Sequence, residues 1–182
     1  MAFHFEHLNL LILEDTEPMR KLLVSIAQNL GVGKVDALGD GNEAFSLFVE
    51  RNHDIILTDW LMKPVDGVSF TRKIRKTPQS PNRMVPIILI TGYSARSRVQ
   101  EARDAGVTEF LIKPFTAFDL AKRIGHVVTN PRDFIKTSDF FGPDRRRRDD
   151  KDYKGPKRRS DDEQEEYRGL PMLDVDFIDK DD

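Results

Sequence analysis

The first 130 positions contain five short strand-like segments, most of them apolar runs, that alternate with amphipathic stretches. Short apolar runs are typical of buried parallel strands, whereas the stretches between them repeat their apolar positions at helical spacing. The predicted strands are residues 8–13, 34–37, 55–58, 85–90 and 109–112, and the predicted helices are residues 18–30, 42–52, 67–76, 95–105 and 117–128. Five consecutive strand–helix units predict an α/β domain over residues 1–129, built on one parallel sheet with helices on both faces.

Both periodicities stop near residue 130, where charged residues, Gly and Pro become dominant. This composition predicts a charged, largely disordered extension over residues 130–182. The whole chain has 29 basic and 31 acidic residues, so its net charge favours no class of partner. It has no cysteine, no apolar run of membrane-spanning length and no signal-like N-terminus, which predicts a cytoplasmic protein without membrane insertion.

Polar residues with complementary chemistry follow four of the five predicted strands. Glu14 and Asp15 follow the first strand, Asp59 the third, Thr91 the fourth and Lys113 the fifth. The C-terminal ends of parallel strands form the ligand-binding edge of such a sheet, and clustered carboxylates there favour Mg²⁺. A carboxylate can accept a phosphoryl group while a hydroxyl and an ammonium stabilise its oxygens. Any one of these carboxylates alone is better explained as a surface residue, but their joint occurrence favours a phosphoryl-accepting pocket.

The spacing of these residues resembles that of a known family. The matching motifs are Leu-Glu-Asp at 13–15, Thr-Asp-Trp-Leu-Met at 58–62, Asp-Gly at 66–67, Thr-Gly at 91–92 and Lys-Pro-Phe at 113–115. They resemble the CheY-like receiver domains of two-component response regulators. The resemblance implies a flavodoxin-like, doubly wound sheet of five parallel strands with five helices, and no output enzyme beyond the receiver's own phosphoryl transfer and dephosphorylation.

The same resemblance assigns roles to individual residues. Asp59 is implied to accept a phosphoryl group from a histidine kinase, with Thr91 and Lys113 contacting that group. The implied Mg²⁺ ligands are Glu14 (through water), Asp15, Asp59 and the Leu61 backbone carbonyl. Phe110 is implied to be an aromatic switch, although ordinary packing is the alternative, and the peptide before Pro114 is implied to be cis. The motif proline comes one position late, at Pro64, and an apolar residue occupies position 61; both departures are expected to alter phosphoryl lifetime.

The extension contains a charged motif that occurs twice. Residues 142–150 read GPDRRRRDD, residues 155–162 read GPKRRSDD, and Tyr153 lies between the two copies. Arginine binds the edge of guanine bidentately, stacks on bases and grips phosphates, whereas carboxylates accept from the guanine amino group. A doubled arginine motif therefore suggests a two-fold ligand, and cyclic di-GMP has two guanines and two phosphates.

This arrangement resembles the arginine-rich extension of the CheY-like cyclic di-GMP effectors, the Cle proteins. The implied ligand-binding residues are Asp144, Arg145, Arg146, Arg147, Arg148, Tyr153, Arg158 and Arg159. The family resemblance implies a signalling adaptor that acts on the flagellar motor switch, to which it would be recruited, and so controls motility and surface attachment.

The extension has three other interpretations. In the first, the chain is a conventional regulator switched at Asp59, and the extension is a docking or polyanion-binding segment. A PilZ domain would also begin with an arginine-rich motif, but about fifty residues leave no room for its barrel. Specific nucleic-acid binding is disfavoured because acidic residues interrupt both basic clusters.

Overall fold

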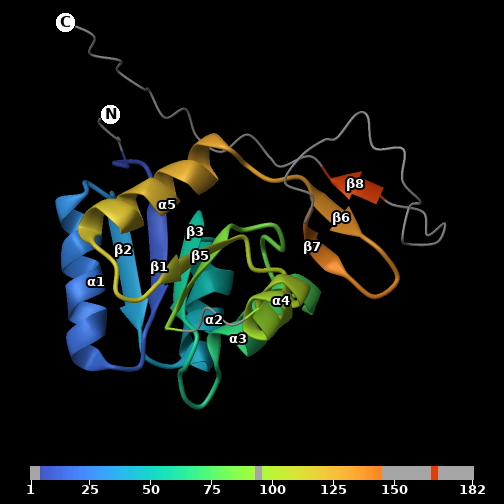
Figure 1. Cartoon of the computed structure of the whole chain (residues 1–182), viewed down its shortest axis with the longest axis horizontal. Coiled ribbons are helices and arrows are strands. Elements are labelled where there is room, and N and C mark those ends of the chain that lie inside the picture. Colours follow the sequence, from blue (N-terminus) through green and yellow to red (C-terminus); the bar gives the residue numbers. More distant parts are fainter. Residues whose placement is uncertain (1–4, 93–95, 145–164, 168–182) are drawn as a thin grey trace, which may run out of the picture.

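The structure is a computed structural model that describes residues 5–92, 96–144 and 165–167, and its main body is a five-stranded parallel sheet (Figure 1). The strands are β1 (Asn9–Leu13), β2 (Lys34–Leu38), β3 (Ile55–Asp59), β4 (Ile87–Thr91) and β5 (Glu109–Ile112), in the order β2-β1-β3-β4-β5. The helices are α1 (Glu17–Asn29), α2 (Gly41–Arg51), α3 (Gly67–Lys76), α4 (Arg96–Ala105) and α5 (Ala117–Thr129). The predicted flavodoxin-like fold is confirmed, and each predicted element lies within two residues of the observed one.

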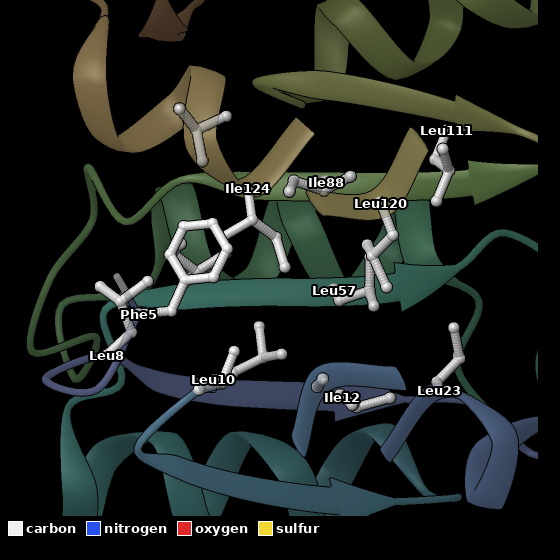
Figure 2. Packing of buried hydrophobic residues seen from close by; sticks show 14 of the residues in the cluster. Phe5, Leu8, Leu10, Ile12, Leu23, Leu57, Ile88, Leu111, Leu120 and Ile124 are labelled. Carbon is white, nitrogen blue, oxygen red and sulfur yellow. The ribbon is translucent and has the colours of Figure 1, made fainter. Parts of the chain in front are cut away.

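The central strands are apolar on both faces because helices cover both sides of the sheet. On one face, Leu10 and Ile12 of β1 pack with Leu23 of α1 and with Leu120 and Ile124 of α5 (Figure 2). Successive side chains of a strand point to opposite faces, so the intervening residues of β1 face the other helices. This alternation explains why the strand reads as a continuous apolar run.

The opposite face of the sheet is covered by α2, α3 and α4. Phe48 of α2 and Phe70 of α3 are fully buried there against Leu11 of β1. Helix α4 contributes only small buried side chains, Ala102 and Ala105, to a third cluster of apolar residues. The contact of α4 with the sheet is therefore thinner than that of α2 or α3.

A second, antiparallel sheet follows α5 (Figure 1). It consists of β6 (Phe134–Lys136), β7 (Phe141–Pro143) and β8 (Glu165–Tyr167) in the order β7-β6-β8. Strands of three residues are too short for a period of two to be visible, so the loss of periodicity after residue 130 did not predict them. The β6–β7 hairpin, residues 134–143, contacts the main body through α3.

Within the described ranges, no helix combines the length and the apolar composition needed to cross a lipid bilayer.

Candidate functional site

The predicted pocket residues lie together at the C-terminal edge of the parallel sheet. Asp59 is the last residue of β3, and Lys113 directly follows β5. The Lys113 Nζ donates to Asp59 Oδ1 at 2.6 Å, and the Leu61 backbone N–H donates to Asp59 Oδ2 at 3.0 Å. Asp59 is only 6% exposed, so its charge is balanced mainly by one ammonium group.

Glu14 is the most enclosed carboxylate of the pocket. Its side chain is 2% exposed, and its Oε1 accepts a hydrogen bond from the Thr16 backbone N–H at 3.0 Å. Its Oε2 is buried without a hydrogen-bond partner and lies 3.7 Å from the Lys113 Nζ. A buried carboxylate oxygen without a donor is costly, so this atom is poised to take up a cation or a water bound to one.

Asp15 is exposed at the rim of the same pocket. Its Oδ2 accepts a hydrogen bond from the Lys63 backbone N–H at 3.2 Å, which ties the end of β1 to the loop after β3. The Lys63–Pro64 peptide in this loop is cis. From the sequence, Pro64 is notable only because it lies one position later than the proline of the family motif.

The donor chemistry of the pocket fits Mg²⁺, which prefers carboxylate, carbonyl and water oxygens. Among the described residues, however, no group of three His, Cys, Asp or Glu side chains has the spacing of a metal site. Asp59 Oδ1 is engaged by Lys113, and Asp15 Oδ2 accepts from a backbone N–H. The orphaned Glu14 Oε2 and the carboxylates of Asp15 and Asp59 would hold the ion only together with backbone carbonyl and water ligands. The predicted Leu61 carbonyl ligand stays a prediction.

Thr91 ends β4 next to the strand that leads to Lys113. Its side chain is buried, and its backbone carbonyl accepts from the Lys113 N–H at 2.8 Å. The Lys113–Pro114 peptide is cis, as the resemblance implied. Thr91 and Lys113 are therefore held in register, while the contact of the Thr91 hydroxyl with a phosphoryl group stays a prediction.

Phe110 lies on β5, three residues before Lys113. It is partly buried and packs against the cluster of Trp60, Leu89 and the alanines of α4. This position connects the edge strand of the sheet with its most thinly attached helix. The structure thus places Phe110 where an aromatic side chain contacts α4, and its switching role stays a prediction.

The turn after β3 requires a glycine. A Cβ on Gly67 would lie 2.1 Å from the Asp59 backbone oxygen, which no side chain could tolerate. The preceding Asp66 caps α3 by accepting hydrogen bonds from the backbone N–H groups of Val68 and Ser69. Partial burial alone would raise the pKa of Asp66, but the hydrogen bonds from Ser69 and Val68 outweigh it, and the pKa lies below its usual value.

One contributor to the pocket was not identified from the sequence. Arg20 of α1 donates through Nη1 to the backbone oxygens of Glu14 at 2.7 Å and of Asp15 at 3.3 Å. Gly39 leaves room for this guanidinium, since a Cβ there would lie 2.8 Å from Arg20 Nη1. No motif signals such a role, because an arginine in the first turns of a helix is ordinarily a solvated surface residue.

Of the predicted ligand-binding residues of the extension, the structure describes only Asp144. Its backbone N–H donates to the Asp133 oxygen at 2.8 Å, and its own carbonyl accepts from Arg132 Nη1 at 3.5 Å. The residues outside the described ranges are Arg145, Arg146, Arg147, Arg148, Tyr153, Arg158 and Arg159. Asp144, the third residue of the first copy of the motif, is therefore held through its backbone by Asp133 and Arg132, just before β6.

Known proteins similar to this chain point to one family. The family model described as the response regulator receiver domain matches residues 10–125. The chemotaxis protein CheY-3 of Vibrio cholerae is 27% identical over 122 residues, which cover 67% of this chain and 92% of that protein. The chemotaxis protein CheY of Pseudomonas aeruginosa is 29% identical over 117 residues, which cover 64% and 93% of the two chains.

Solved structures agree with the sequence matches. The chemotaxis protein CheY4 of Vibrio cholerae superposes with a TM-score of 0.61 at 27% identity, covering 66% of this chain and 98% of that one. The receiver domain of a sensor histidine kinase from Pseudomonas aeruginosa, solved with a magnesium ion coordinated in its active-site cleft, gives a TM-score of 0.58 at 29% identity. That match covers 65% of this chain and 94% of the other. Both matches cover about two thirds of this chain.

Proposed function

The chain belongs to the response regulator receiver domain family, and we propose that it is a signalling adaptor with two inputs. The first input is phosphoryl transfer to Asp59 from a histidine kinase. The second is binding of cyclic di-GMP by the arginine-rich motifs after residue 143. The output is a change in the surface that the protein offers to a protein partner, for which the flagellar motor switch is the leading candidate.

The observation that carries the first input is the contact of the Lys113 ammonium with Asp59 beside the orphaned Glu14 oxygen. In the transfer, an Asp59 carboxylate oxygen forms a bond to phosphorus as the bond from phosphorus to the donor group breaks, and the donor leaves with the bond's electron pair. Lys113 balances the negative charge that gathers on the phosphoryl oxygens. Mg²⁺, when bound, would neutralise the carboxylates and the phosphoryl group together. Asp15 and Glu14 supply oxygen donors for it.

Support for the second input comes from the sequence repeat and from the two strands, β7 and β8, that lie before and after it along the chain. Strands β7 and β8 both pair with β6, so the chain leaves this sheet after Pro143 and is again part of it at Glu165. Strands on either side of a common neighbour lie roughly 10 Å apart. Both arginine motifs therefore fall in one stretch whose two ends are tied to the same small sheet, which favours the two copies acting on one ligand.

Support for a protein partner comes from exposed apolar side chains. Ile112 at the end of β5 is 50% exposed, and Phe118 at the start of α5 is 69% exposed. Large apolar side chains with this exposure are available for contact with a partner. The family resemblance makes the flagellar motor switch the first partner to test, with Phe118→Ser as the variant expected to lose binding in a pull-down of the purified proteins.

Acetyl phosphate with Mg²⁺ tests the first input. We expect the wild type to take up an acid-labile, hydroxylamine-sensitive phosphoryl label and Asp59→Asn to take up none. Asp54→Asn, at the opposite end of β3, is the control and should label as the wild type does. A label that survives in Asp59→Asn would show that the acceptor is another residue.

Calorimetry with cyclic di-GMP tests the second input. The wild type should bind at micromolar ligand concentration, and Arg145→Ala/Arg158→Ala should lose binding because each motif loses an arginine. Arg98→Ala, which removes an exposed arginine of α4, serves as the control and should leave binding unchanged. Absence of binding by the wild type would eliminate the second input and leave a regulator switched at Asp59 alone.

The polyanion-binding interpretation makes a different prediction. Binding to mixed-sequence DNA through phosphates weakens steeply with increasing salt concentration. Recognition of guanine by paired arginines also uses hydrogen bonds to the base edge, so salt concentration is not the one factor that sets its affinity. We expect cyclic di-GMP to bind more tightly than a mixed-sequence oligonucleotide at physiological salt. Comparable affinities would favour a general polyanion-binding segment.

A further inference from the structure

The receiver holds a buried arginine at the end of the sheet opposite to Asp59. Arg75, in the last turn of α3, is 1% exposed, and its Nε and Nη1 donate to the backbone oxygens of Gly106 at 3.1 Å and Arg83 at 2.7 Å. Among the described residues it forms no ion pair with a carboxylate, and its Nη2 is buried without a partner. Burial, together with the nearby Arg83 cation, lowers the pKa of Arg75 to about 9. The guanidinium is therefore still charged at neutral pH.

Backbone dipoles explain how this charge is tolerated. Arg75 lies at the C-terminal end of α3, and Gly106 immediately follows the last residue of α4. The C-terminal ends of both helices carry partial negative charge and unpaired carbonyls. The Arg75 guanidinium satisfies the carbonyl of Gly106 after α4 and that of Arg83 in the loop after α3, and the Arg83 Nε donates to the Arg75 backbone oxygen in return. Gly106 has a φ of +96°, and a Cβ there would lie 2.9 Å from the Arg75 side chain. Arg75 therefore joins the ends of α3 and α4 through backbone oxygens.

The β6–β7 hairpin covers this arginine with aromatic rings. The Phe134 ring centroid lies 5.1 Å from the Arg75 guanidinium carbon, and the Phe141 centroid lies 4.5 Å from that of Arg83. The two rings are 5.6 Å apart, and Phe134 is 3% exposed. Arginines stacked on aromatic faces are held by cation–π attraction, which strengthens when the pair is removed from water. The hairpin is thus docked on a surface whose chemistry complements it.

A second contact joins the segment before the hairpin to β5. Arg132 Nη2 lies 3.5 Å from Glu109 Oε1, and Glu109, the first residue of β5, is 5% exposed. Arg123 and His126 of α5 lie 3.4 Å and 3.7 Å from the same carboxylate. The N-terminal end of β5 is therefore attached to both α5 and the chain that leads into the hairpin.

Strand β5 connects this docking surface with the pocket. It is an edge strand, paired only with β4, so contacts at its ends contribute much to its position. Its first residue, Glu109, contacts Arg132, and its second residue is Phe110. The residue directly after the strand is Lys113, which donates a hydrogen bond to Asp59. The strand rise makes this path about 13 Å long.

We propose that the face formed by Arg75, Arg83, Gly106 and Glu109 is a docking surface for the chain's own residues 132–143, and that hairpin docking is thermodynamically linked through β5 to occupancy of the Asp59 pocket. The docked hairpin holds the N-terminal end of β5. Because β5 is then already restrained, less conformational entropy is lost when Lys113 is fixed against an anion. A preorganised lysine binds the anion more tightly. Linkage is reciprocal, so an occupied pocket favours the docked hairpin by the same factor.

The first test measures hydrogen exchange of the full chain without any ligand, so it does not depend on the proposed role of Asp59. Phe134→Leu removes the ring but keeps an apolar side chain, and it should speed amide exchange over residues 107–112 by about fivefold, the loss expected for one buried cation–π contact. Lys136→Ala, an exposed change in the same strand, is the control and should leave β5 unchanged. Unaltered exchange of β5 in Phe134→Leu, with faster exchange confined to residues 132–143, would overturn the linkage.

The second test rests on the proposed function of Asp59. Beryllofluoride with Mg²⁺ mimics a phosphoryl group on a carboxylate, and Trp60, the chain's one tryptophan, adjoins Asp59 and reports binding by fluorescence. Arg132→Gln removes the charge that contacts Glu109 and should weaken beryllofluoride binding by about fivefold. Conversely, beryllofluoride should slow amide exchange over residues 134–143 in the wild type.

The outcomes of the second test separate the two proposals. If the wild type binds beryllofluoride and Arg132→Gln binds it equally well, the linkage is wrong while the phosphoacceptor role of Asp59 stands. If the wild type shows no response, the phosphoacceptor role and the linkage both fail. Weaker binding by Arg132→Gln together with slower hairpin exchange in the wild type would support both.

Discussion

The two ends of the parallel sheet bury charges of opposite sign. At the C-terminal end of the strands, the carboxylates of Glu14 and Asp59 face one lysine, and the Glu14 Oε2 is left without a hydrogen-bond partner. At the N-terminal end, the guanidinium of Arg75 is fully enclosed by backbone oxygens and by an aromatic ring. The first end is open to ligands, whereas the second is covered by the protein's own chain, which leaves Arg75 Nη2 buried without a hydrogen-bond partner.

Helix α3 spans the distance between these two ends. Asp66 caps its N-terminus beside the pocket, and Arg75 occupies its last turn beneath the hairpin. An acid at the N-terminus and a base at the C-terminus both complement the helix dipole. The same helix therefore favours negative charge near Asp59 and positive charge at the docking surface. This difference predicts that substitutions at the closed end affect mainly stability, and those at the open end mainly chemistry.

The largest effect on stability is expected for Arg75→Ala. The substitution leaves a cavity between α3, α4 and Phe134, and it removes the donors to the Gly106 and Arg83 oxygens. We expect the free energy of unfolding to fall by about 3 kcal/mol, measured by urea denaturation followed through Trp60 fluorescence.

Arg75→Met is the matched control, because it keeps most of the side-chain volume but removes the charge and the hydrogen bonds. Replacing a buried charge by an apolar side chain restores part of the stability, so Met should cost clearly less than Ala. Equal costs for Ala and Met would show that the hydrogen bonds, rather than the filled volume, carry the contribution of Arg75.

The largest effect on chemistry is expected for Lys113→Met. Removing the ammonium leaves the carboxylates of Glu14 and Asp59 unopposed and the phosphoryl oxygens without their cation, so labelling by acetyl phosphate should slow by about a hundredfold. Mg²⁺ affinity, followed through Trp60 fluorescence, should be unchanged or higher because Asp59 Oδ1 is freed. A parallel loss of Mg²⁺ affinity would mean that the pocket itself had collapsed.

The sequence predicts the two ends unequally. The strands are apolar runs flanked by breakers, and parallel strands bring their C-terminal ends to one edge, so Asp59, Glu14 and Lys113 could be placed together from their order alone. Arg75 could not be placed, because a charged residue in the last turn of a helix is ordinarily solvated and its burial depends on Phe134, 59 positions later. The hairpin could not be predicted for the same reason. It is stabilised by tertiary contacts, and the spacing of its own apolar residues does not indicate it.

A smaller effect at the open end is expected for Arg20→Met. Arg20 holds the backbone oxygens of Glu14 and Asp15, so its loss should weaken Mg²⁺ binding by about fivefold, the equivalent of one hydrogen bond of ~1 kcal/mol. Gly39→Ala should act in the same direction, since its methyl group would displace the Arg20 guanidinium.

The two substitutions form a double-mutant cycle. If Gly39→Ala acts through Arg20, it should have no further effect on Mg²⁺ affinity in the Arg20→Met background. Additive effects would show that Gly39 influences the pocket by another route.

The smallest effect is expected for Asp66→Asn, and it should depend on pH. The folded-state pKa of Asp66 lies below the ordinary 3.8, so its charge stabilises the fold fully above that value, and this stabilisation is lost as the pH falls through the folded pKa. At pH 7, Asp66→Asn should therefore cost about 0.5 kcal/mol, and near pH 3 the difference from the wild type should shrink. Asp66→Ala removes the cap at every pH and should keep its deficit under acid conditions. A deficit in Asp66→Asn that is equally large at both pH values would mean that the geometry of the cap, and not its charge at the N-terminus of α3, stabilises this end of the helix.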